Sequence, residues 1–327
     1  MSVMSRLTKW VDTESKRSGK SKASVLSSFI HDYFTYGVNP KEYYWFHFDE
    51  KTPEQKKTFF TKKMFLKLLK RNNDPAFVQI LNDKYIFSQT FAEFTGRKVI
   101  RSGKNMDEKD LEKILEDTER VIYKPKDGSG GSNVQIFDKK DYLDVNVLVD
   151  KLRSLPDGVV EQWIKQHEAM SAAYPDAVNC IRVATLYRDG ECHWLGAVFT
   201  LGRNHNKITN SFQGAIFGLI DIETGIVTTD LCNYSDELFE KHPDTGFVAK
   251  GFQVPYWKEV LELTAKASAV VPQVGYIGWD VAIAENGPVL IEGNSVSAGY
   301  YAYQHYLLRE DGKGSRAVWE PYTTCTY

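Results

Sequence analysis

Cysteine is scarce in this chain of 327 residues. It occurs four times, at Cys180, Cys192, Cys232 and Cys325, with no paired spacing. This pattern excludes a disulfide framework and a zinc site built from cysteine pairs, so we expect reduced thiols. The seven histidines are scattered, and none forms a metal-binding pair at helical spacing.

Long apolar runs are also missing. No stretch approaches the roughly 20 apolar residues that a bilayer-spanning helix needs. Residues 1–20 are basic but contain neither an apolar core nor a cleavage site, so the sequence does not predict secretion. There is no internal repeat and no low-complexity segment. With 42% hydrophobic residues, the chain can bury more than one core, and we expect a cytoplasmic enzyme of two or three subdomains.

Acidic residues are few in the N-terminal part. Residues 1–80 carry 15 Lys and Arg against 8 Asp and Glu, whereas the whole chain has a net charge of −2. Apolar residues recur at helical spacing, so this part is predicted to be helical. Its lysines form either a solvated face or a surface attracted to an anionic membrane or a phosphate-bearing substrate. Nucleic acid is not expected as a partner, because no known binding module accompanies the charge.

The stretch from Tyr276 to Asn294, YIGWDVAIAENGPVLIEGN, predicts a β-hairpin. Apolar residues alternate before Glu285-Asn286-Gly287, a typical turn, and a second apolar run follows it. Glu292 and Asn294 are two residues apart, so their side chains point to the same face. If Asp280 faces them, three hard oxygen donors meet, which is the ligand chemistry of magnesium bridging phosphates.

The turn decides whether these donors meet. A two-residue loop at Asn286-Gly287 would pair Asp280 with Gly293 and send Glu292 to the opposite face. A three-residue loop at 285–287, with Gly287 left-handed, would instead place Asp280 opposite Glu292. The chemistry favours the second register. The alternative is that Asp280 belongs to a solvated face, as single acidic residues on strands often do.

A lysine and a glycine-rich turn occur together in VIYKPKDGSGGS, residues 121–132. Lys124 lies on a short apolar strand, and a further strand is predicted at 133–137. Backbone N–H groups of such a turn can surround phosphate oxygens while the lysine adds positive charge. The spacing fits neither a P-loop nor a dinucleotide fingerprint. The turn is therefore either a lid over phosphates or a plain flexible connection.

Two more apolar runs carry polar side chains. Residues 159–164, VVEQWI, read as a strand whose backbone could bind adenine. Residues 179–187, NCIRVATLY, read as a strand that carries Arg182 among apolar residues. A buried guanidinium needs an anionic partner, and structural ion pairing explains such an arginine about as often as function does.

The order of these motifs resembles the ATP-grasp superfamily, and most closely the sugar-transfer-associated ATP-grasp family. The resemblance covers roughly residues 30–300. It rests on Asn82-Asp83-Lys84 opening a helix, VIYKPKDGSGGS, VVEQWI, VNCIR, HPDTG at residues 242–246, and GWDVAIAENGPVLIEGN. Each motif alone is modest, but their order is specific.

The resemblance implies how ATP would be held. Lys84 and Lys124 would hold its phosphates. Glu161 would accept from the adenine amino group, Trp163 would add backbone contacts, and Glu168 would bind the ribose hydroxyls. The residues that would close over the phosphates are Gly128, Ser129, Gly130, Gly131 and Ser132.

The resemblance also implies the chemistry. Asp280, Glu292 and Asn294 would hold two magnesium ions. Arg182 would act at the transferring phosphoryl group, with Lys124 as the second catalytic cation. In the ATP-grasp pattern a carboxylate attacks the terminal phosphate of ATP, and an amine then captures the acyl phosphate. The glycine-rich lid would exclude water from that intermediate.

The predicted fold is α+β, an ATP-grasp fold of two lobes that enclose the nucleotide, preceded by a helical region. The predicted parts are a basic helical region at 1–80, a small lobe at 81–165, a large antiparallel lobe at 166–308 and a C-terminal tail at 309–327. Asn82 is expected to cap a helix that runs through Phe94 and ends at Gly96, with Lys84 in its first turn. A helix is also expected at 257–269, and the tail is expected to be a surface extension.

Residues 201–214 are predicted to be a long connection between strands. Arg203, His205 and Lys207 could bind an acidic substrate there, or the segment is an exposed polar loop. Three functions compete for the whole chain: a carboxylate–amine ligase, a kinase on the same scaffold, and a nucleotide-binding protein without turnover. The ligase is favoured because the metal ligands, both lysines and the arginine are all present. The family name makes a sugar carboxylate in surface polysaccharide assembly the expected acid, by analogy alone.

Overall fold

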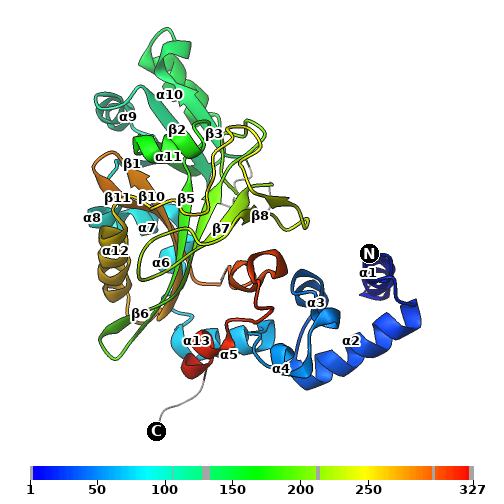
Figure 1. Ribbon diagram of the computed structural model, residues 1–327. Helices are drawn as coiled ribbons and strands as arrows, with labels where there is room; N and C mark the ends of the chain where they lie inside the picture. The colour runs from blue at the N-terminus through cyan, green and yellow to red at the C-terminus, as the bar shows by residue number, and fades with distance from the viewer. Residues whose placement is uncertain (1–2, 105, 127–132, 211–213, 297–298, 324–327) are drawn as a thin grey trace. The chain divides into compact units, whose positions relative to one another are not determined.

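The computed structural model describes residues 3–104, 106–126, 133–210, 214–296 and 299–323 (Figure 1). The chain divides into two compact units. One is continuous, Asn72–Gly299, and the other combines Met1–Arg71 with Tyr300–Tyr327. Among the described residues, no helix is both long and apolar enough to cross a bilayer.

A seven-stranded antiparallel sheet forms the larger part of the continuous unit, in the order β11-β10-β5-β6-β7-β8-β9. Its long strands are rich in β-branched and aromatic residues, as the sequence predicts. Strand β11 lies at one edge. The strands are β5 (Cys180–Arg188), β6 (Glu191–Leu201), β7 (Ile216–Ile220), β8 (Leu231–Cys232), β9 (Leu238–Phe239), β10 (Tyr276–Ala284) and β11 (Gly287–Asn294).

One face of this sheet is apolar and buried. Helix α12 (Trp257–Val270) packs on it (Figure 1), close to the helix expected from the sequence. Ile181, Val183, Trp279 and Val281 all belong to the core on this side. Because side chains alternate along a strand, the residues between them, Arg182 on β5 and Asp280 on β10, point to the opposite face.

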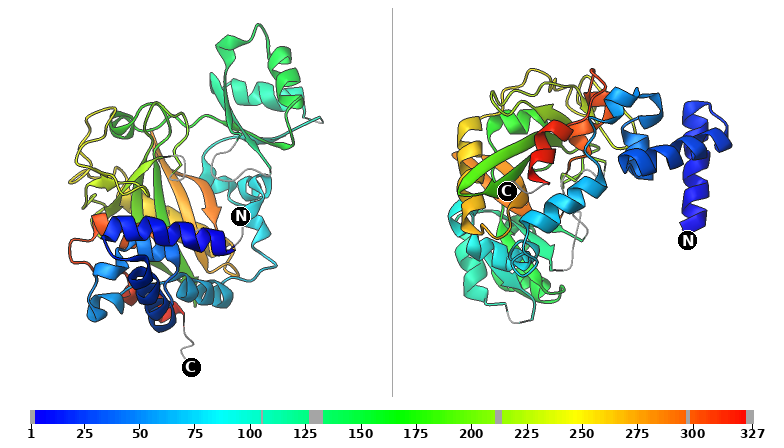
Figure 2. Two further views of the ribbon diagram at one scale, coloured as in Figure 1. Left: turned by 90° about the vertical axis from the view of Figure 1, so that its right-hand side faces the viewer. Right: turned by 90° about the horizontal axis from the view of Figure 1, so that it is seen from below.

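A four-stranded antiparallel sheet forms the smaller part of the continuous unit, in the order β1-β4-β2-β3. Helices α9 (Glu108–Leu115) and α10 (Val145–Arg153) cover one face (Figure 2). Val121 and Tyr123 are buried with them. Lys124 therefore points away from these helices. The strands are β1 (Val99–Ser102), β2 (Arg120–Pro125), β3 (Gln135–Asp138) and β4 (Gly158–Gln162).

The expected helix at 82–94 is two shorter helices. Helix α7 (Lys84–Thr90) is capped by the Asp83 carboxylate, which accepts from two backbone N–H groups, so the expectation that Asn82 is the cap is wrong. Asn82 instead ends α6 (Gln79–Asn82). Helix α8 (Ala92–Thr95) follows, and Gly96 ends it with φ +57°. Lys84 does lie in the first turn.

Short helices make up the second unit. The lysine-rich helix α5 begins at Lys62, and Phe59 and Phe60 are buried just before it. Further turns are η1 (Phe48–Glu50), η4 (Ala302–Gln304), η5 (Tyr306–Leu308) and η6 (Glu320–Tyr322). The helices are α1 (Val3–Ser18), α2 (Lys22–Tyr36), α3 (Pro40–Trp45), α4 (Pro53–Lys56), α5 (Lys62–Asn72) and α13 (Arg316–Trp319).

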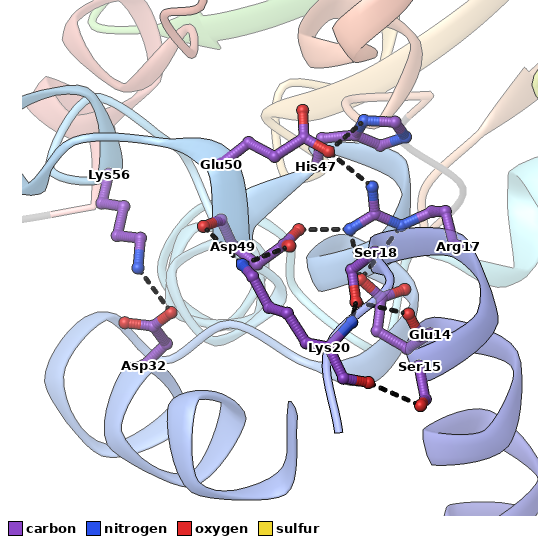
Figure 3. Close-up of polar contacts among 10 residues, drawn as sticks. All are labelled: Glu14, Ser15, Arg17, Ser18, Lys20, Asp32, His47, Asp49, Glu50 and Lys56. Atoms are coloured by element: carbon purple, nitrogen blue, oxygen red, sulfur yellow. Dashed lines mark hydrogen bonds and ion pairs between the residues drawn. The ribbon is translucent and has the colours of Figure 1, made fainter. Parts of the chain in front are cut away.

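Ion pairs join α1 to η1 in this unit (Figure 3). Arg17 donates to Glu14 on its own helix and to Asp49 and Glu50 of η1, the last at 2.7 Å. Lys20 donates to Asp49 at 2.8 Å. A buried pair is a weak argument for stability, but the loss of Arg17 would leave the buried Glu14 carboxylate without a compensating charge.

The C-terminal segment packs into this unit. Trp319 is fully buried and stacks on Phe60 with ring centroids 5.3 Å apart. The Gln304 amide accepts from the Phe60 N–H at 2.7 Å and donates to the Phe60 carbonyl at 2.9 Å. The expectation of a surface extension at 309–327 is therefore wrong at Trp319, because a large apolar ring finds a partner more than 200 residues earlier in the chain.

Candidate active site

The hairpin of β10 and β11 places Asp280 directly opposite Glu292. The predicted pairing is thus confirmed, but the predicted loop is not. Ala284 pairs with Gly287, so the loop has two residues, Glu285 and Asn286. Gly287 allows the tight return with φ +133°. A β-bulge then shifts the register between Asp280 and Val281, and Ile291 is the extra residue on β11.

Three oxygen-bearing side chains meet on this face. The Asn294 amide Nδ2 donates to Glu292 Oε1 at 3.1 Å and lies 3.5 Å from Asp280 Oδ2. Within the described ranges, no group of three or more His, Cys, Asp and Glu side chains is placed to hold a metal. The set is therefore two carboxylates and one amide. These are hard oxygen donors, which fit magnesium in a site where substrate phosphates and water complete the coordination.

Arg182 lies directly across from Asp280 on the neighbouring strand β5. Its Nε donates to Asp280 Oδ1, and its Nη2 donates to Oδ2 at 2.7 Å. Burial raises the pKa of Asp280 to about 6, and Glu292 adds to this, although Arg182 opposes both. Burial would also raise the pKa of Glu292, but Arg182, Asn294 and Lys124 together lower it. Glu292 is thus the more readily ionised of the two carboxylates.

Both predicted phosphate-binding lysines lie beside this group. The Lys84 Nζ donates to the Pro125 carbonyl at 3.1 Å, at the end of strand β2. Burial lowers the pKa of Lys84, Lys124 lowers it further, and Glu292 raises it. Lys124 in turn lowers the pKa of Glu292. These mutual effects mean that Lys84, Lys124 and Glu292 on β11 share one electrostatic environment.

Glu161 on β4 is buried between two cations. Its Oε2 accepts from Arg97 Nε at 2.8 Å and from Lys124 Nζ at 2.9 Å. Burial would raise the pKa of Glu161, but Arg97 and Lys124 outweigh burial and lower it to about 2. An adenine amino group would have to compete with these cations for the carboxylate, and that role stays a prediction.

Arg97 is the residue that the sequence did not single out. It follows Gly96 and precedes strand β1. The only signal at this position is a glycine at the end of a helix, which is common and points to no ligand. Its importance depends on two distant partners, Glu161 and the bulge of β11, which local sequence does not connect.

The other residues predicted to bind the nucleotide are the glycine-rich segment, Glu168 and Trp163. Gly128–Ser132 lie outside the described residues. Glu168 is exposed at the first residue of α11 (Glu168–Ala173). The Arg120 guanidinium lies over the Trp163 ring, 5.0 Å from its centroid. A cavity of about 790 Å³ lies between the segment 162–165 and the hairpin turn. Arg97 and Trp163 line this cavity. The residues that do not line it are Lys84, Lys124, Asp280, Glu292 and Asn294.

The three side chains predicted to bind an acidic substrate already have partners, and Lys207 pairs with Asp176 at 2.5 Å. Arg203 donates to the Gly214 carbonyl at 2.7 Å and to Glu237 at 3.2 Å. His205 lies 2.8 Å from Asp176 and is mostly exposed. The connection is present as predicted, between β6 and β7, but its side chains pair partly with Asp176 and Glu237, which lie outside it. A role in binding an acidic substrate stays a prediction for all three.

Comparison with known proteins gives one family. A family model described as sugar-transfer associated ATP-grasp matches residues 63–304. No curated protein matches the chain significantly. Among solved structures, the ATP-grasp ligase PsnB with its minimal precursor has a TM-score of 0.45 and 12% identity over 77% of this chain and 63% of that one.

Two further solved structures are similarly distant. D-alanine–D-alanine ligase from Bacillus anthracis has a TM-score of 0.41 and 15% identity, over 74% of this chain and 69% of that one. The VanG D-Ala:D-Ser ligase from Enterococcus faecalis has a TM-score of 0.46 and 10% identity, over 74% of this chain and 61% of that one. This chain thus spans less than two thirds of PsnB and of VanG. The family match, which covers most of this chain, carries the assignment.

Proposed function

The chain belongs to the sugar-transfer associated ATP-grasp family, and from that premise we propose that it is an ATP-dependent carboxylate–amine ligase that forms an acyl phosphate. The proposed acid is a sugar carboxylate and the proposed amine an amino compound, in the assembly of a surface polysaccharide. The family description supports the sugar setting, and that support is analogy. The side chains of the site support the chemistry.

The balance of charge on one face of the site carries this proposal. Arg182 donates to Asp280, and Lys84 and Lys124 lie within electrostatic range of Glu292, so three positive charges surround the two carboxylates. Phosphoryl transfer needs little covalent help from a protein, so positive charge held in place around the phosphates supplies most of the catalysis. A site that only bound adenine would have no need of this group.

Each side chain of the group has a proposed role. Lys84 and Lys124 bind the phosphates of ATP. Glu292, Asn294 and the lone pairs of Asp280 that Arg182 leaves unused would hold magnesium, which when bound would neutralise charge on the phosphate oxygens. Arg182 is held by Asp280 in a fixed orientation, so that it can stabilise the charge that develops on the transferring phosphoryl group.

The proposed nucleotide contacts complete the site. Glu161 lies on strand β4 in contact with Lys124, and Trp163 follows the strand beside Arg120, where the adenine would bind. Glu168 would bind the ribose. The glycine-rich segment 128–132 would close over the phosphates and exclude water from the acyl phosphate.

The chemistry proceeds in two displacements. A carboxylate oxygen of the acid attacks the terminal phosphorus of ATP, the bond to the bridging oxygen breaks, and ADP leaves. The amine then attacks the acyl carbon, loses a proton, and forms the amide. The leaving group is inorganic phosphate, which takes one oxygen of the original acid with it. A kinase that phosphorylates a hydroxyl leaves the phosphate on its product instead.

An oxygen-18 label in the acid tests this route. A screen of uronic acids with amino acids for ADP release identifies a reacting pair, and the labelled acid of that pair is then used. The ligase places label in the released inorganic phosphate and an amide in the product, both read by mass spectrometry. Unlabelled phosphate with amide formation excludes the acyl phosphate. Phosphate retained on an organic product identifies a kinase, and Mg-ATP binding without ADP release across the screen contradicts the ligase.

A further inference from the structure

Arg97 is a buried arginine, and each of its three guanidinium nitrogens donates a hydrogen bond. Its side chain is 4% exposed. Besides Glu161, it donates from Nη1 to the carbonyls of Thr95 at 3.0 Å and Leu290 at 2.6 Å, and from Nη2 to the Ile291 carbonyl at 3.2 Å. A guanidinium in such surroundings is retained only if its donors are satisfied, and here each nitrogen has an acceptor.

Two of these acceptors, the carbonyls of Leu290 and Ile291, belong to the bulge of strand β11. Strand β11 lies at the edge of its sheet, and backbone groups at an edge need partners from elsewhere. Leu290 is the last residue before the register shift, and Ile291 is the extra residue. Without this bulge, Asp280 would face Ile291 and the Glu292 side chain would point to the apolar face. Arg97 thus binds the backbone that turns Glu292 toward Asp280.

The side-chain acceptor, Glu161, links Arg97 to Lys124. If Lys124 were the sole partner of the buried Glu161, the two charges would cancel. With Arg97 also donating to the same Oε2, the group of two cations and one carboxylate keeps a net positive charge. Glu161 therefore offsets the charge of Lys124 only in part, and the lysine can still attract a phosphate.

Gly96 permits the backbone turn that places Arg97 at this position. Its φ of +57° is left-handed, and an added Cβ would lie 2.6 Å from Val289 Cγ1. The chain can therefore turn against β11 only with glycine here. The close approach brings the next residue, Arg97, over the edge of the sheet.

We propose that Arg97 is a positioning residue for ATP and magnesium, which holds the bulge of β11 and the Glu161–Lys124 pair in their binding geometry with one guanidinium. This inference rests on the proposed function, because the geometry matters only if phosphates and magnesium bind there. The fork of the guanidinium is essential: a lysine would supply the charge but cannot reach Glu161 and two carbonyls together.

The test compares Arg97→Lys and Arg97→Ala with the wild-type chain. Arg153 is the matched control, because it also donates from Nε and Nη2 to a backbone carbonyl, that of Met106, but contacts neither β11 nor Glu161. Calorimetric titration measures the affinity for a non-hydrolysable Mg-ATP analogue and the magnesium concentration required. Hydrogen exchange of the ligand-free chain at 288–294 reports on the bulge independently of binding. Circular dichroism confirms folding, and Arg97→Lys carries the test if Arg97→Ala does not fold.

We expect Arg97→Lys to weaken Mg-ATP binding by about tenfold or more, as loss of a residue that orients metal ligands does. Exchange at 288–294 should be faster, whereas Arg153→Lys changes neither. Millimolar guanidinium chloride should restore part of the affinity of Arg97→Ala, since Arg97 lines the 790 Å³ cavity through which the ion can enter. Equal sodium chloride should not.

Three results would overturn the inference while leaving the proposed function in place. They are wild-type affinity and exchange in Arg97→Lys, an equal loss in Arg153→Lys, and no rescue by guanidinium in folded Arg97→Ala. A wild-type chain that binds no Mg-ATP overturns the proposed function and this inference with it.

Discussion

Arg182 and Asp280 face each other as direct partners on strands β5 and β10, and the guanidinium holds both oxygens of the carboxylate. The pair keeps each side chain in one orientation on the face opposite the apolar core. A carboxylate has about four lone-pair sites, so Asp280 can keep Arg182 and still present oxygen to a cation. The arginine is thereby oriented by the same residue that is proposed to hold magnesium.

We expect Arg182→Lys to lower kcat far more than it raises KM for ATP. Lysine keeps one positive charge, but it cannot form the two-pronged contact with Asp280. The charge would lose its fixed position, which matters most in the transition state. Steady-state kinetics with a reacting acid and amine measure both constants. Lys124→Ala is the comparison, and it should mainly raise KM for ATP. If Arg182→Lys also changes mainly KM, the catalytic role of Arg182 is contradicted.

Glu292→Ala should lower turnover by on the order of a hundredfold, because it removes a ligand needed to hold magnesium against the phosphates. The fold should persist, since Glu292 lies on the polar face. Glu285→Ala is the matched control on the same hairpin, where the glutamate pairs with Lys165 at the surface. Initial rates and thermal unfolding are measured for both variants. Unfolding of Glu292→Ala, or near-normal turnover, would show that the residue is structural.

Mg-ATP should stabilise the chain against heat. A ligand that binds only the folded state adds about 2.7 kcal/mol when its concentration is a hundred times its dissociation constant. Thermal unfolding with ATP, with magnesium and with both measures the effect. The largest shift should require both, because the carboxylates of Asp280 and Glu292 repel phosphate unless a cation lies between them. The absence of any shift at millimolar nucleotide would contradict ATP binding.

His305 should make the helical unit sensitive to acid. Burial, with a contribution from His47, lowers the pKa of His305 from 6.5 to about 3 in the folded chain. The unfolded chain therefore binds the proton more readily. The stabilisation is complete above pH 6.5 and is lost as the pH falls toward 3, by about 1.4 kcal/mol per pH unit. Urea unfolding measured between pH 7.5 and 5 should show that the free energy of unfolding depends less on pH in His305→Asn than in the wild-type chain. An equal pH dependence would contradict the buried neutral state of His305.

The parts of the fold that depend on local pattern were predictable. Alternating apolar residues and turn signals gave β2, β5, β10 and β11, and the capping carboxylate was missed by only one residue, from Asn82 to Asp83. These features depend on a few neighbouring residues. Lys84 could be placed for the same reason.

Long-range partners were not predictable. The facing of Asp280 and Glu292 was correctly expected from ligand chemistry, but the bulge at Ile291 that produces it depends on packing along the edge of the sheet. The contact of Arg97 with that bulge and the burial of Trp319 against Phe60 join segments far apart in sequence. No periodicity in a short window reports such contacts.

Because the helical unit is built from both ends of the chain, it cannot be completed early during synthesis. Gln304 follows its partner Phe60 by 244 residues, which at about 5–20 residues per second is a delay of roughly 12–50 seconds on the ribosome. The whole of Asn72–Gly299 is translated within that interval and can fold first. Until then the aromatic residues around Phe60 lack partners such as Trp319, so we expect this helical unit to mature after Asn72–Gly299 and to depend more on chaperones.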